Sequence, residues 1–142
     1  MLEFISGLHI FVGILILIVG FIFHWIGQLI SILDWDLATS LGLQEKDMPP
    51  EFKVYEHAIA VADVSIGWTY GIAAVGLVLG LPWAVKLVWI PGVILIYHSL
   101  SFWYWTGNRI KLGYHLETRR LRVAWSLLNF ITGILAIIIA WQ

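Results

Sequence analysis

Long apolar runs separated by short polar connections are the main pattern of this chain. The runs lie at about residues 4–33, 52–81, 83–106 and 121–141 and consist mostly of aliphatic, small and aromatic residues. About 20 apolar residues are enough for an α-helix to cross a hydrocarbon core of roughly 30 Å. The pattern therefore predicts four transmembrane helices in an up-down bundle, forming one all-α domain over residues 1–142.

Small and polar residues recur within these runs at helical spacing, which predicts the helix faces that lie against protein. Residues seven apart share one face of a helix, and small side chains let helices in lipid approach closely. The stripes comprise Gly13, Gly20 and Gly27 in the first run, Glu56, Asp63 and Tyr70 in the second, and Ser126, Asn129, Thr132 and Gly133 in the last. We expect these faces to point into the bundle.

Composition agrees with lipid as the solvent. Hydrophobic residues make up 61% of the 142 residues and charged residues 12%, whereas a typical soluble domain has about 45–50% and 25%. The net charge of −1 offers no basic stripe for nucleic acid. Cysteine is absent, which excludes disulfides, thiolate metal sites and thiol catalysis. The expected partners are membrane lipids and further membrane subunits.

The distribution of basic residues predicts the orientation. Positive residues concentrate in the cytoplasmic connections of membrane proteins. Only Lys86 lies at the other side of the predicted bundle, and the first and third connections hold Lys46, Lys53, Arg109, Lys111, Arg119, Arg120 and Arg122. Both termini are therefore expected on the non-cytoplasmic side, most naturally of the cell membrane. The first apolar run exceeds the core of a signal peptide, so we expect a retained helix.

One polar residue from each predicted helix falls at a similar depth. With a rise of about 1.5 Å per residue, His24, Asp63, His98 and Asn129 lie roughly 11–15 Å from the cytoplasmic ends of their helices. A second level nearer the cytoplasm contains Gln28, Glu56, Ser101 and Tyr104, with Tyr97 on the same face as the last two. The predicted ligand-binding residues are these nine.

Asp63 carries most of the functional interpretation. A charge at the bilayer centre costs at least about 2.5–3.5 kcal/mol on insertion scales, so such residues face a bundle interior or a wet cavity. Asp63 is too far from Glu56 to share a proton, because two helical turns separate them by about 10.5 Å; His24 or His98 is the expected partner. We expect a cytoplasm-facing polar and aromatic pocket for a small or lipidic molecule, with proton coupling as an option.

Several alternatives remain open at the level of sequence. The polar layer fits an accessory subunit of a larger complex, where it would only join helices, and it fits an intramembrane isomerase. His24 and His98 could ligate one haem b as axial ligands, and with Asp63 they form a two-histidine, one-carboxylate metal set, although no local metal-binding spacing supports that set. Nucleotide-binding, nucleophile-elbow and zinc-protease motifs are missing, so no catalytic residue and no metal ligand is assigned.

Overall fold

The computed structural model describes the backbone of residues 2–114 and 119–142 and the side chains of 7–114 and 120–142. All secondary structure in these residues is helical. In chain order the elements are α1 (Leu2–Leu15), the π-helix η1 (Ile16–Ile26), α2 (Gly27–Leu33), α3 (Trp35–Ser40), α4 (Pro50–Val78), α5 (Pro82–Leu87), α6 (Trp89–Lys111) and α7 (Arg119–Ala140).

Four stretches of these described residues are helical, long and apolar enough to cross a membrane. They are Gly7–Leu33, Pro50–Val78, Pro82–Lys111 and Arg120–Ala140. The all-helical membrane class predicted from the sequence is therefore confirmed on length and composition.

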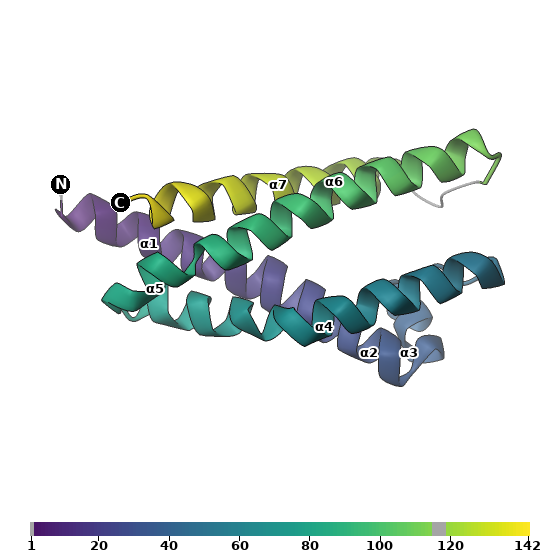
Figure 1. The fold of residues 1–142 in the computed structure, drawn as a ribbon, viewed down its shortest axis with the longest axis horizontal. Helices are drawn as coiled ribbons and strands as arrows, with labels where there is room; N and C mark the ends of the chain where they lie inside the picture. The colour runs from purple at the N-terminus through teal and green to yellow at the C-terminus, as the bar shows by residue number, and fades with distance from the viewer. Residues whose placement is uncertain (1, 115–118) are drawn as a thin grey trace.

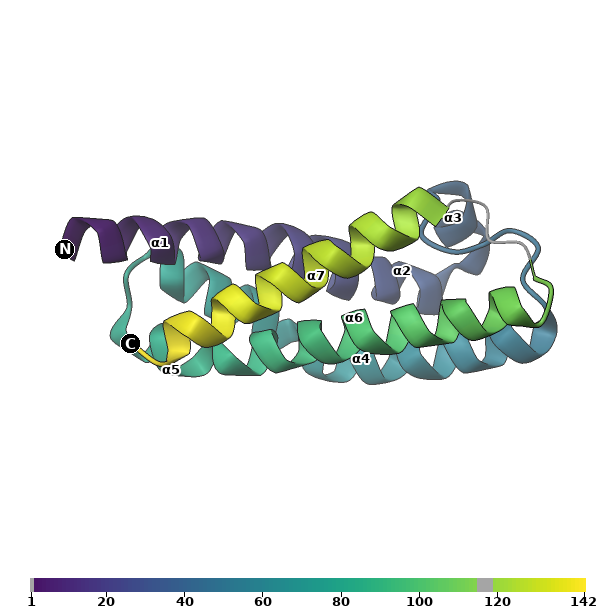
Figure 2. The same ribbon diagram turned by 90° about the horizontal axis from the view of Figure 1, so that it is seen from above.

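The long helices run along one axis and form two closely packed pairs. The α1–η1–α2 helix packs on α4, and α6 packs along α7; contacts between the two pairs are much less extensive. The N- and C-termini lie at one end of the molecule, and α3 lies toward the other end, at which α4 begins and α6 ends (Figures 1 and 2). A layer between the two pairs is thus where residues from all four long helices can meet.

Prolines and glycines set the helix ends. Pro50 occupies the first turn of α4, where a missing N–H costs nothing. The helix ends at Val78 rather than near residue 81, because Gly80 adopts a positive φ of 67° and Leu81 N–H donates to the Gly76 carbonyl at 2.8 Å. This is the usual glycine-based helix termination.

The third predicted helix differs from expectation in two ways. It is divided into α5 and α6 at Val88, because Pro91 has no N–H to donate to the carbonyl of Leu87, four residues earlier. It also continues to Lys111 instead of ending near residue 106. The polar connection between the third and fourth predicted runs is accordingly shorter, and its residues 115–118 lie outside the described part of the chain.

The small-residue stripes face protein as predicted. Gly13, Gly20 and Gly27 are buried, and a Cβ on Gly20 would lie 2.5 Å from the ring of Tyr70 on α4. A Cβ on Gly133 of α7 would lie 2.7 Å from the carbonyl oxygen of Gly92 on α6. Both helix pairs therefore depend on glycine at their closest approach.

The middle of the first span is a π-helix, which the sequence pattern did not indicate. Over Ile16–Ile26 the backbone is wider than an α-helix, and His24 lies in its last turn. Hydrogen bonds of the π type join residues five apart, and such segments are uncommon and frequent at functional sites.

Candidate functional site

The structure brings the predicted polar layer together between the two helix pairs. His24 Nε2 lies 2.5 Å from Asn129 Oδ1, and His98 Nδ1 lies 3.5 Å from Asp63 Oδ2. The two imidazole rings meet edge to face, with centroids 4.0 Å apart. Together with Gln28 these four residues form what we call the polar cluster.

Asn129 determines the tautomer of His24. The Asn129 amide nitrogen donates to the Trp125 carbonyl at 2.7 Å, which fixes the orientation of the amide and leaves Oδ1 facing His24. An amide oxygen only accepts hydrogen bonds, so His24 Nε2 must be the donor. In the neutral imidazole Nδ1 then carries a free lone pair. Burial of both side chains, at 3% and 0% exposure, holds this arrangement in place.

The carboxylate of Asp63 is held by long contacts. Its Oδ2 accepts a hydrogen bond from Gln28 Nε2 at 3.3 Å, and its distance to His98 is too long for a good hydrogen bond. The prediction that Asp63 pairs with a histidine of the layer is confirmed for His98. The side chains of Asp63 and His98 are 16% and 14% exposed. Gln28 Oε1 is buried and has no hydrogen-bond partner among the described residues.

Glu56 lies toward the end of the bundle that holds α3, two turns from Asp63 on the same inward face. It is half-buried and interacts electrostatically with His98, Arg109 and Asp63 among others. Within the described residues its carboxylate makes no hydrogen bond or ion pair. Two carboxylates thus share one face of α4, and no Lys or Arg in the described part of the chain binds either of them.

Four of the nine predicted residues do not join the polar cluster: Glu56, described above, and three residues of α6. Tyr97 and Tyr104 are 66% and 70% exposed. Ser101 is half-buried, and its side chain makes no hydrogen bond to any described residue. Successive residues of an α-helix point about 100° apart, so turning His98 inward turns this neighbouring face outward. The structure therefore does not bring Tyr97 and Tyr104, which were predicted as ligand-binding residues, to the polar cluster.

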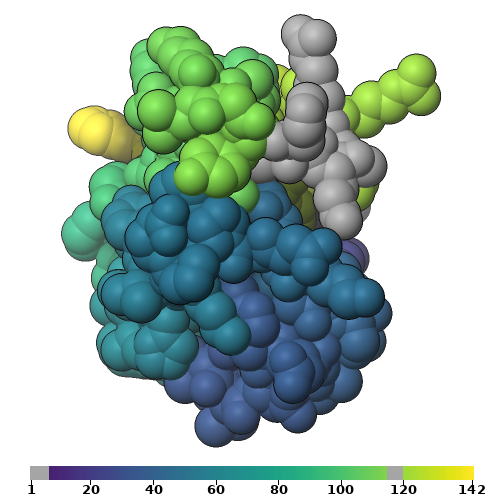
Figure 3. All heavy atoms as spheres, turned by 90° about the vertical axis from the view of Figure 1, so that its right-hand side faces the viewer, coloured from purple at the N-terminus to yellow at the C-terminus, as the bar shows by residue number. Residues whose placement is uncertain are grey.

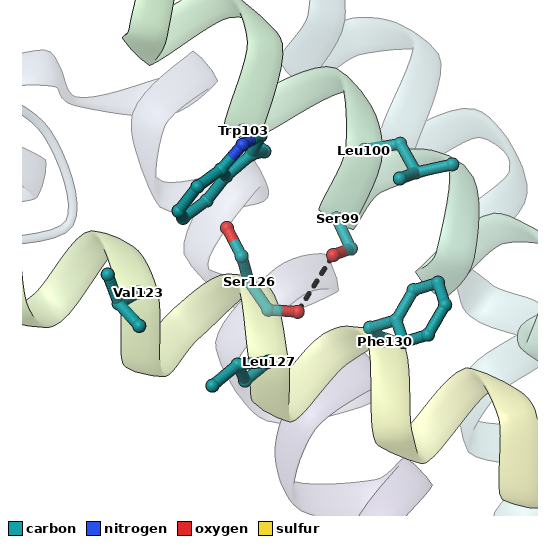
Figure 4. A pocket seen from close by; sticks show the side chains of 7 residues that line it. All are labelled: Ser99, Leu100, Trp103, Val123, Ser126, Leu127 and Phe130. Carbon is teal, nitrogen blue, oxygen red and sulfur yellow. Dashed lines mark hydrogen bonds between the residues drawn. The ribbon is translucent and has the colours of Figure 1, made fainter.

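A depression on the outside of the bundle lies elsewhere. It has a volume of about 230 Å³ between α6 and α7 and is almost entirely apolar (Figure 4). Its floor is closed by the Ser99 hydroxyl, which donates to the Ser126 carbonyl at 2.7 Å. None of the nine predicted residues lines this depression, so it is not the polar pocket that was expected.

Arg109 forms a buried clamp that sequence reasoning missed. Its guanidinium binds both oxygens of Glu45 at 3.0 and 2.7 Å, although the side chain is only 3% exposed. The rings of Phe52 and Trp105 lie 4.9 and 4.6 Å from the guanidinium carbon. Figure 3 shows the end of α6 seated on the first connection and the start of α4. Arg109 and Glu45 are 64 residues apart, so no local pattern could have linked them.

The geometry of the histidines does not fit haem. An iron between two axial imidazoles needs about 2 Å on each side for the metal–nitrogen bonds alone, in addition to the distance from each nitrogen to its ring centroid. Centroids 4.0 Å apart and perpendicular rings leave no space for an iron and its macrocycle. We therefore derive no role for haem from His24 and His98.

The same residues do form a compact set of metal-binding atoms. One ring nitrogen of His24, one of His98 and one carboxylate oxygen of Asp63 all lie within 4.8 Å of one another.

Comparison with protein-family models, with curated proteins and with solved structures gave no match for this chain. Function must therefore be argued from the site itself.

Proposed function

We propose that this chain is an up-down four-helix membrane protein whose polar cluster binds a small polar ligand or the polar group of a lipidic molecule. The observation that carries the proposal is the incomplete bonding of Asp63, which lies between four apolar helices with 16% of its side chain exposed. Buried carboxylates are normally compensated by several donors or by a cation. The ligand supplies the missing partner.

The cost of burial argues against a purely structural role. A polar contact between membrane helices is worth about 0.6 kcal/mol on average, whereas a central carboxylate costs several times as much. Asn129 and Ser99 already join helices through neutral hydrogen bonds. Replacing Asp63 by a neutral polar residue would join them at lower cost.

The ligand enters from the cytoplasm in this proposal, and both termini face the other side. Seven of the eight Lys and Arg residues lie in, or at the helix ends beside, the two connections that we assign to the cytoplasm. Glu56 lies between that end and Asp63, so polar groups continue from the entrance to the cluster. The opposite half of the bundle is filled by residues such as Val12, Ile16 and Leu77.

Single cysteines test access, because the chain has no cysteine of its own. Glu56→Cys and Asp63→Cys should react with a charged, membrane-impermeant maleimide in inside-out vesicles, and much more slowly in right-side-out vesicles. Ala62→Cys is the matched control, since Ala62 neighbours Asp63 but lies on the outer surface toward lipid. Gln142→Cys should show the opposite sidedness.

If Asp63→Cys is labelled no faster than Ala62→Cys, and circular dichroism shows both variants folded, the site is not accessible to water and the proposal is contradicted. Faster labelling of Glu56→Cys from the outer side would contradict the proposed entrance and orientation. The first result would favour the accessory-subunit alternative, in which the polar cluster only joins helices.

A further inference from the structure

We propose that the ligand of the polar cluster is a divalent first-row transition-metal ion bound by His24, Asp63 and His98. This inference rests on the proposed function, because it names the ligand of the same site. The three side chains come from η1, α4 and α6, and their donor atoms already lie within 4.8 Å of one another.

Distances between the donor atoms suit a metal better than a hydrogen-bond network. With bonds of about 2.0–2.1 Å, two ligands of a tetrahedral ion are roughly 3.4 Å apart. His98 Nδ1 and Asp63 Oδ2 are separated by 3.5 Å, which is long for a hydrogen bond and close to that tetrahedral edge. Small side-chain rotations would bring the remaining donor into range.

Asn129 prepares His24 as a ligand. Metal-bound histidines usually donate their other ring N–H to a carbonyl or carboxylate oxygen, which fixes the tautomer. His24 Nε2 makes this bond to Asn129 Oδ1, and Asn129 is itself fixed by Trp125. The lone pair on Nδ1 is therefore the one offered to the ion. Gln28 holds Asp63 in the same manner.

The surroundings of Asp63 suit a cation as the ligand. Among the described residues no Lys or Arg binds Asp63, and Arg109 binds Glu45 instead. A metal ion at the three donor atoms would compensate the Asp63 carboxylate directly. Glu56, two turns away on the same face of α4, would add to the attraction through space when it is ionised.

The donor set defines the class of ion. Two imidazoles and one carboxylate suit Zn²⁺, Fe²⁺, Co²⁺ or Ni²⁺, whereas Mg²⁺ and Ca²⁺ prefer oxygen ligands. Three protein ligands leave at least one coordination position for water or substrate. The partnerless Gln28 Oε1 could accept a hydrogen bond from a metal-bound water.

The test uses the full-length protein in detergent, purified without a polyhistidine tag and stripped with chelator. Titration with Co²⁺ should give ligand-field absorption bands that saturate at one ion per chain, and Zn²⁺ should displace them. Asp63→Asn and His98→Ala should each weaken the affinity at least 10-fold, and Glu56→Gln severalfold. His57→Ala is the matched control, because His57 lies two turns from Asp63 with an exposed side chain.

Two results would overturn the inference. One is the absence of Co²⁺ and Zn²⁺ binding to protein that circular dichroism shows to be folded. The other is stoichiometric binding that Asp63→Asn and His98→Ala leave unchanged, which would place the ion elsewhere. If metal binding fails but Asp63→Cys is still labelled from the cytoplasmic side, the proposed function stands and only its metal assignment falls.

Discussion

The Arg109 clamp yields the sharpest prediction about stability. Arg109→Ala removes two charge-assisted hydrogen bonds to Glu45 and the contacts of the guanidinium with Phe52 and Trp105. Removing one partner of a buried ion pair costs about 3–5 kcal/mol, because the remaining charge is left uncompensated. Glu45 keeps 31% exposure and can be hydrated, so we expect a smaller loss of about 2–3 kcal/mol in the free energy of unfolding.

A double-mutant cycle separates the pair from its surroundings. Glu45→Ala, Arg109→Ala and the double variant should give a coupling energy of about 1.5 kcal/mol or more, because hydrogen bonds to charged groups contribute about 1.5–3 kcal/mol. Arg109→Lys should recover only part of the loss, since an ammonium group cannot bind both oxygens in the planar geometry of a guanidinium. The assay is unfolding by SDS titration in mixed micelles, followed by circular dichroism.

Lys111→Ala is the matched control for this cycle. Lys111 lies in the same last turn of α6 and carries the same charge, but it is exposed. It should change the free energy of unfolding by less than about 0.5 kcal/mol. If Arg109→Ala costs no more than Lys111→Ala, or if the coupling energy falls below about 0.3 kcal/mol, the clamp is a surface ion pair and the reasoning fails.

Two further predictions concern helix packing. Gly133→Ala should lower the free energy of unfolding by about 1–3 kcal/mol, because the added Cβ would lie 2.7 Å from a backbone oxygen of α6. Gly7→Ala is the control: a Cβ added at Gly7 would meet no described atom within 4 Å, so this change should be neutral or slightly stabilising. Trp25→Phe should cost about 0.5–1.5 kcal/mol, because the indole N–H donates to the Val64 carbonyl at 3.0 Å. Trp89→Phe changes an exposed tryptophan and should have no measurable effect in the same SDS titration. If both variants lost the same free energy of unfolding, the role of the Trp25 hydrogen bond would be refuted.

The depth of the polar layer could be predicted because helix geometry is nearly invariant. A constant rise per residue placed His24, Asp63, His98 and Asn129 at one level, and these residues do meet. The buried faces of the first, second and fourth spans were also predictable, because small and polar residues seven apart define a face without knowledge of the neighbouring helices.

The rotation of α6 could not be predicted in the same way. Its C-terminal half has aromatic residues on most sides, and such residues are favourable both at a membrane interface and inside a bundle. Tyr97 and Tyr104 therefore fitted an inner wall as well as an outer belt, and only packing against α7 decides between the two. The π-helix of the first span and the Arg109–Glu45 pair likewise depend on tertiary contacts that leave no local signature.

The position of the polar cluster links the two proposals to the architecture. His24 and Asp63 belong to one helix pair, and His98 and Asn129 belong to the other. Contacts between the pairs are sparse compared with those within them. A ligand bound by residues of both pairs therefore bridges the weakest interface of the bundle. Binding of an ion at 100 times its dissociation constant stabilises the folded state by about 2.7 kcal/mol, and that energy would act mainly on the docking of one pair against the other. A structural polar layer would show no such dependence on the ion, so ligand-dependent docking of the pairs is what distinguishes a binding site from helix packing.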